Sequence, residues 1–160
     1  MENSTRFWTR AAIIAALYVA LTYIVNLFGL ASGVIQVRLS EALTILPIFT
    51  SAAIPGLTIG CLLANLLTGC APWDIVFGTL ATFLGTIGTR ALKNKPLLAT
   101  LPPIISNTII VPFVLSYVYA VPDSIPFLML TVGAGEIISC GILGYLLQMV
   151  LRPHSSKLFD

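Results

Sequence analysis

Long apolar runs, separated by short polar or charged stretches, make up most of the chain. Each run is interrupted by glycine, proline or charge before the next begins, which predicts a series of helices. A helix that crosses a bilayer needs about 20 apolar residues, so the second and third runs are short for full spans. The six predicted helices cover residues 9–28, 37–54, 57–67 or 57–69, 75–89, 97–119 and 126–151.

The composition indicates that these predicted helices belong to a membrane protein. The 160 residues are 58% hydrophobic and only 9% charged, whereas soluble domains carry roughly a quarter charged residues. We therefore expect an all-α integral membrane protein, with six transmembrane helices in one domain over residues 1–160. The first apolar run is too long for the core of a signal peptide, so we expect it to be retained.

The basic residues alternate with the apolar runs in a way that predicts orientation. They cluster before the first run, after the fourth and after the sixth, while the opposite loops hold Asp74 and Asp123 and no lysine. The positive-inside rule then places both termini in the cytoplasm. The net charge of +2 reports this topology and not a nucleic-acid surface. The basic clusters are Arg6 with Arg10, residues 90–95, and Arg152 with Lys157.

A charged pair, Arg38 and Glu41, lies between two long stretches without charge, residues 11–37 and 42–73. Charges in such positions are costly and mark functional sites by default. If the stretch is helical, the spacing of three puts both side chains on one face, where an internal ion pair is the alternative to a functional role. Glu136 is a second isolated acid, about ten residues into the last run.

These groups and several other polar or aromatic residues fall in the outer half of the predicted bundle. A carboxylate accepts two parallel hydrogen bonds from a guanine-like N–H edge, arginine and amides donate to ring oxygens and nitrogens, and an aromatic ring stacks. We therefore predict a pocket for a planar polar heterocycle, open to the outside. The alternatives are amides that join helices, a tryptophan in the interface belt and an aspartate that caps a helix. The candidate ligand-binding residues are Arg38, Glu41, Asn65, Trp73, Asp74, Asn107, Tyr117 and Glu136.

No pattern in the sequence favours catalysis, a cofactor or a metal. His154 is isolated in the tail, and the three cysteines are scattered without metal or redox spacing. Residues 133–135 begin like a dinucleotide fingerprint, but Ile138 replaces the final glycine, and no phosphate-binding lysine motif occurs. We expect no enzyme activity, no ATPase site and no bound cofactor.

Three alanines, Ala12, Ala16 and Ala20, lie at i, i+4 spacing along the first run. Small residues in such a stripe let another helix approach closely, which is the main source of packing energy in lipid. The stripe is predicted either to pack inside the bundle or to dock a separate protein.

Four blocks, residues 36–44, 53–57, 60–66 and 74–82, resemble the QueT family. Its members are substrate-binding S-components of energy-coupling-factor (ECF) importers in bacterial cell membranes, assigned to queuosine precursors of the 7-deazaguanine type. The resemblance implies a six-helix S-component that captures a nucleobase-like ligand from outside. It also implies docking, through the alanine stripe, onto one transmembrane coupling subunit with two ATPase subunits. Delivery would follow by toppling in the membrane, and residues 29–36 would cover the pocket.

Three alternatives remain open on the sequence. An S-component of the same architecture could bind a different vitamin or base, since fold does not fix function. A self-sufficient secondary transporter would couple protons through its acids. A membrane scaffold without transport would use the alanine stripe and not the pocket.

Overall fold

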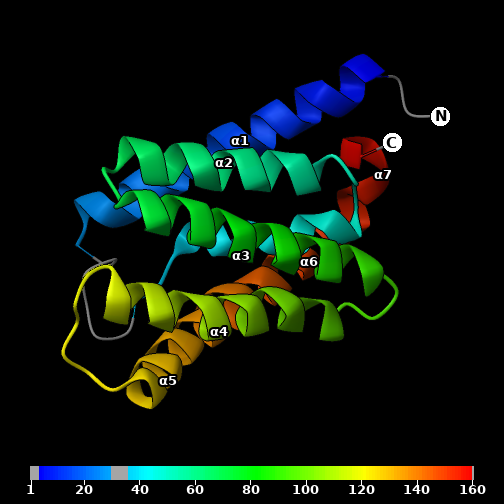
Figure 1. The fold of residues 1–160 in the computed structure, drawn as a ribbon. Helices are drawn as coiled ribbons and strands as arrows, with labels where there is room; N and C mark the ends of the chain where they lie inside the picture. Colours follow the sequence, from blue (N-terminus) through cyan, green and yellow to red (C-terminus); the bar gives the residue numbers. More distant parts are fainter. Residues whose placement is uncertain (1–3, 30–35, 160) are drawn as a thin grey trace.

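The computed structural model describes residues 4–29 and 36–159, and no strand occurs within them (Figure 1). Residues 30–35, which include most of the predicted pocket cover, lie outside the described part. The long helices are α1 (Ser4–Leu27), α2 (Ala53–Leu67), α3 (Pro72–Ala91) and α4 (Leu101–Tyr117). Two 3₁₀ helices accompany them, η1 (Leu39–Ile48) and η2 (Leu98–Thr100). The C-terminal part consists of α5 (Ile125–Glu136), the π-helical turn η3 (Ile137–Leu143), α6 (Gly144–Leu151), the 3₁₀ turn η4 (Arg152–His154) and α7 (Ser155–Phe159).

The helices have the length and surface of membrane helices. Three helical segments, Ser4–Leu27, Leu98–Tyr117 and Ile125–Phe159, are long and apolar enough to cross a bilayer. Many large apolar side chains are also exposed, including Leu27 at 81% and Leu130 at 70%. The prediction of an all-helical fold is confirmed, and the three long apolar helices are consistent with a membrane protein. Six crossings and cytoplasmic termini stay predictions.

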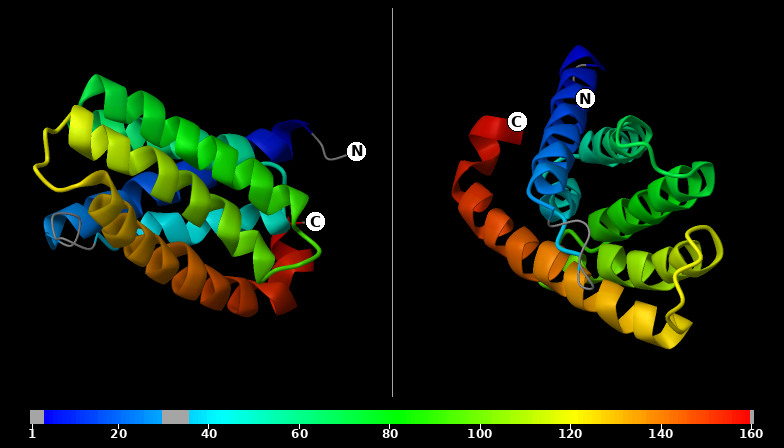
Figure 2. Two further views of the ribbon diagram at one scale, coloured as in Figure 1. Left: turned by 60° about the horizontal axis from the view of Figure 1, so that its bottom comes forward. Right: turned by 90° about the vertical axis from the view of Figure 1, so that its left-hand side faces the viewer.

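The helices pack in chain order around η1. Helix α1 packs on α2, α2 on α3, α3 on α4, and α4 on α5, while η1 contacts α1, α2, α3, η3 and α6 (Figure 2). Seven of the ten residues of η1 are buried. The charged segment of the sequence therefore leads directly into the centre of the molecule.

Two local predictions are wrong. Arg38 precedes η1 in an extended conformation, with φ −109° and ψ 105°, so Arg38 and Glu41 do not share a helix face. The helix break predicted at Pro55 falls earlier, at residues 49–52, and α2 begins at Ala53. Proline is well tolerated in a first helical turn, where its missing N–H has no partner to lose.

Helix α1 uses two different alanine stripes. Ala11 and Ala15 are buried against α2, where a Cβ on Gly56 would lie 2.7 Å from the Ala11 oxygen. Gly60 makes a similarly close approach to Ala15. The predicted stripe of Ala12, Ala16 and Ala20 is exposed instead, so it does not pack inside the bundle.

The start of α1, the end of α3 and the short helix α7 lie at one end of the bundle (Figure 1). Arg10 donates from Nη1 to the Phe159 oxygen at 2.7 Å, and Arg90 donates from Nη1 to the Pro47 oxygen at 2.9 Å. The Phe49 and Phe159 rings stack there with centroids 5.3 Å apart. The predicted clustering of the basic residues on one side thus corresponds to one physical end of the molecule.

Candidate functional site: a polar cavity beside η1

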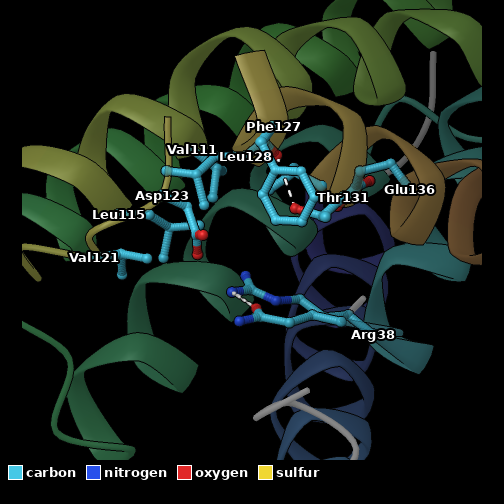
Figure 3. A pocket seen from close by; sticks show the side chains of 11 residues that line it. Arg38, Val111, Leu115, Val121, Asp123, Phe127, Leu128, Thr131 and Glu136 are labelled. Atoms are coloured by element: carbon cyan, nitrogen blue, oxygen red, sulfur yellow. Dashed lines mark hydrogen bonds between the residues drawn. The ribbon is translucent and has the colours of Figure 1, made fainter. Parts of the chain in front are cut away.

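A cavity of about 460 Å³ lies between α4, α5 and the segment that leads into η1 (Figure 3). Its volume falls within the 300–1,000 Å³ typical of small-molecule sites. One wall is apolar and carries the ring of Phe127, and the other groups are polar. The polar lining residues are Gln36, Arg38, Asp123, Thr131 and Glu136, and the apolar ones are Val111, Leu115, Val121, Phe127, Leu128 and Val132.

A close backbone crossing positions Arg38 in this cavity. A Cβ on Gly135 would lie 2.2 Å from the Gln36 carbonyl oxygen, so only glycine allows the segment to cross α5 here. The Arg38 backbone N–H donates to Ser139 Oγ at 3.0 Å, and its guanidinium Nη2 donates to Gln36 Oε1 at 3.4 Å. Ser139 belongs to the π-helical turn η3, an irregularity that often accompanies functional sites.

Two buried carboxylates meet behind the cavity wall. Glu41 is 2% exposed and Glu136 is 7% exposed. The Tyr18 hydroxyl donates to Glu41 Oε1, and the Cys140 thiol donates to Glu136 Oε2 at 3.1 Å. Of these two buried acids, Glu136 lines the cavity and Glu41 does not. Glu136 is therefore the one that a ligand can reach.

The amide of Asn107 leaves an unused donor beside these acids. Asn107 is 5% exposed and its side chain interacts with both Glu41 and Glu136. Its Nδ2 nevertheless completes no hydrogen bond of acceptable geometry among the described residues. Buried polar groups are normally paired, and Asn107 does not line the cavity, so its donor lies beside the two acids and not in the space open to a ligand.

The same cluster has the donor types of a metal site. One ligand-type atom from each of Glu41, Glu136 and Cys140 lies within 4.8 Å of the others. The Cys140 thiol is already hydrogen-bonded to Glu136, and Tyr18 already donates to Glu41. These hydrogen bonds account for the closeness of the three groups, and no metal role is assigned to them.

Asn65, a predicted ligand contact, lies on the far side of Arg38. It lines a second cavity, of about 60 Å³, together with Tyr18 and Ser40, and Arg38 borders both cavities. The Asn65 Nδ2 donates weakly to Cys61 Sγ at 3.7 Å. Asn65 is therefore close to Arg38 but does not line the larger cavity.

Trp73 and Tyr117 lie apart from the polar cavity. They are 61% and 77% exposed, and with Phe77 and Phe113 they line a separate apolar groove of about 640 Å³ between α3 and α4. The expected stacking of Trp73 over a ligand among the acids does not fit this position. Phe127 is the aromatic ring that faces the polar cavity.

Asp74 begins α3 and is held by a tyrosine. The Tyr119 hydroxyl donates to Asp74 Oδ2 at 2.8 Å and accepts the Ala71 backbone N–H at 3.1 Å. Partial burial, together with Asp74, raises the pKa of Tyr119 to about 12, so this hydroxyl stays a donor at neutral pH. Asp74 thus joins the first turn of α3 to the loop after α4 and does not line the cavity.

Several residues of the site were not among the candidates from the sequence, namely Tyr18, Gln36, Asp123, Phe127 and Cys140. Cys140 follows Glu136 by four residues, and this spacing places both on one helix face. Asp123 entered the sequence analysis only as an outer-loop charge. Gln36 was predicted only as the end of the pocket cover, residues 29–36. For Tyr18 and Phe127 the sequence carried no signal, because their proximity to the acids arises from packing between distant segments.

An all-helical chain with long apolar segments and an internal polar cavity has the architecture of a multi-pass membrane protein with room for a small ligand. The sequence comparison then gives the family. A model described as QueT transporter matches residues 8–153, and the chain belongs to this family. The description of this family is that of a transporter.

A curated relative supports the same assignment. The "Queuosine precursor transporter QueT" of Lactococcus lactis subsp. cremoris (strain MG1363) is 40% identical over 74 residues. The aligned part spans 46% of this chain and 43% of the relative, less than half of either. No solved structure matches the chain.

Proposed function

We propose that this chain is the substrate-capturing subunit of an ECF importer and binds a queuosine precursor, a 7-deazaguanine base, in the polar cavity. The observation that carries the proposal is that Arg38 and Glu136 line one ligand-sized cavity in a QueT family member. The relative's printed name supports the class of substrate.

The cavity offers a complementary set of contacts for such a base. Glu136 would accept two N–H groups from the guanine-like edge, and Arg38 would donate to a ring oxygen or nitrogen. Asn107, which interacts with both buried acids, would act on the ligand only through Glu136. Phe127 would contact the face of the ring, and Glu41 would act from behind through the buried network.

The alanine stripe supplies a surface for the partner. Ala12, Ala16 and Ala20 line an apolar groove of about 550 Å³ formed by α1 and α2. A helix of the coupling subunit would lie on this stripe, and ATP hydrolysis on the two ATPase subunits would drive toppling and release. In this proposal the chain binds no ATP itself.

Ligand binding can be tested by thermal unfolding of the purified protein in detergent. Ligands that bind only the folded state raise Tm by mass action. We expect 7-deazaguanine bases to raise Tm, and guanine and unrelated vitamins to raise it less or not at all. If only a vitamin raises Tm, the chain would still be proposed as an S-component, but the proposed substrate would be wrong. If no compound raises Tm, the binding proposal would be contradicted.

Glu136→Gln tests the carboxylate that faces the cavity. Loss of a charge-assisted bidentate contact costs about 1.5–3 kcal/mol, so the Kd for a 7-deazaguanine should rise about 10- to 100-fold. Asp74→Asn, which alters an acid outside the cavity, should change Kd less. Equal losses in the two variants would contradict the assignment of the site to this cavity.

Reconstitution in vesicles distinguishes the ECF proposal from a proton-coupled secondary transporter. The second possibility has one supporting observation, the buried pair of Glu41 and Glu136. The ECF proposal expects uptake only with the coupling subunit, both ATPase subunits and ATP. Uptake by the chain alone, driven by a proton gradient, would establish the secondary transporter instead.

A further inference from the structure

Asp123 stands at the end of the cavity away from Glu136. Figure 3 shows the two carboxylates on opposite sides, with Phe127 between them. Asp123 belongs to the segment that joins α4 to α5, and its side chain is exposed. A ligand ring with one edge at Glu136 and its face against Phe127 would direct its opposite edge toward Asp123.

The Asp123 carboxylate has no structural partner that would explain its position. No hydrogen bond or ion pair joins it to another residue in ranges 4–29 and 36–159. It directly precedes Ser124, the N-cap of α5, and makes no capping hydrogen bond. By contrast, Asp74 at the same end of the bundle is hydrogen-bonded by Tyr119.

The charges around the cavity favour a cation. Asp123 and Glu136 line it with Arg38 as the one basic residue among the described lining residues, and Glu41 lies just behind Glu136. A neutral ligand that covers Asp123 removes water from a carboxylate without replacing its hydrogen bonds, which weakens binding. A ligand ammonium at this point supplies those hydrogen bonds in charge-assisted form.

We propose that the cavity selects 7-deazaguanines whose side group carries a cationic amine, and that Asp123 is the specificity-determining residue. This inference rests on the proposed function, because it assumes that the base binds with one edge at Glu136 and its face against Phe127. It adds the charge of the substrate's side group, which the family assignment leaves open.

Two bases of similar size test the inference, 7-aminomethyl-7-deazaguanine, which is a cation, and 7-cyano-7-deazaguanine, which is neutral. Calorimetry on the full chain in detergent would measure both Kd values. The wild type should bind the cationic base about tenfold more tightly than the neutral one. Raising the salt concentration should reduce the preference, because Asp123 is exposed.

Two variants of the same position provide the control. Asp123→Asn should lose about tenfold in affinity for the cationic base and retain its affinity for the neutral base, whereas Asp123→Glu should keep the preference. Equal affinities in the wild type, a preference that persists in Asp123→Asn, or equal losses for both bases in that variant would each overturn the role of Asp123. If the wild type binds neither base, the proposed function itself fails, and this inference fails with it.

Discussion

Tyr18 and Cys140 hold the two buried acids in place. Tyr18 is 2% exposed and donates to Glu41, and Cys140 is 1% exposed and donates to Glu136. A buried carboxylate that loses a donor keeps its desolvation cost without compensation. These two neutral residues therefore determine whether the acids can remain inside the bundle.

Tyr18→Phe removes one donor and leaves the shape of the side chain almost unchanged. We expect a loss of about 1–3 kcal/mol of stability, because Glu41 would keep an unpaired oxygen, and thus a Tm lower by several degrees in detergent. Tyr23→Phe, on an exposed residue of the same helix, is the matched control. It removes only a solvent-exposed hydrogen bond to the Leu67 oxygen, so it should change Tm little. An unchanged Tm in Tyr18→Phe would show that Glu41 does not need this donor.

At the scale of elements, the crossing of residues 36–38 over α5 forms the site. The crossing depends on a missing side chain at Gly135, and the π-helical turn that follows presents Ser139 to the Arg38 backbone. Because the segment then enters η1, the same crossing fixes both Arg38 in the cavity and Glu41 behind it. The geometry of the site is a property of two elements in contact and not of either alone.

Gly135→Ala tests this crossing. A methyl group there would lie 2.2 Å from a backbone oxygen, so the segment must move, and we expect at least a tenfold weaker ligand affinity. Gly141→Ala on the same continuous helix is the control, because its nearest neighbour lies at 3.6 Å. That change should be tolerated or slightly stabilising, since alanine favours a helix over glycine by about 1 kcal/mol. Equal affinities in both variants would contradict the role of the crossing.

At the scale of the whole molecule, ligand binding and partner docking occupy different surfaces. The cavity lies by α4 and α5, whereas the groove with Ala12, Ala16 and Ala20 lies on α1 and α2. The two are connected through η1, which contacts α1 and α2 on one side and η3 and α6 on the other. A change confined to the groove should therefore separate assembly from ligand binding.

Ala16→Leu fills the groove and makes this separation testable. We expect weaker association with the coupling subunit, because a close helix contact depends on small residues, together with an unchanged Kd for the ligand. Ala91→Leu, at an exposed alanine in α3, is the control and should leave both measurements unchanged. Co-purification with the coupling module measures association. Normal association of Ala16→Leu would remove the stripe from the docking surface.

The sequence by itself determined the class of protein, the helical segments and the charged residues that matter most. Apolar runs and scarce charge are local properties of the chain, and the cost of a charge among apolar residues identified Arg38, Glu41 and Glu136 without a structure. The sequence did not predict the break before α2 or the extended conformation of Arg38. Both follow from the packing of η1 in the centre of the bundle and not from local preference.

Only the tertiary structure decided which polar residues share a cavity. It placed Asp123, Phe127 and Glu136 around one cavity and left Trp73 on an exposed groove, because depth along a helix does not specify the direction in which a side chain points. It also separated the two alanine stripes of α1, one against Gly56 and one exposed. Such choices depend on contacts between segments far apart in the chain, which no local pattern encodes.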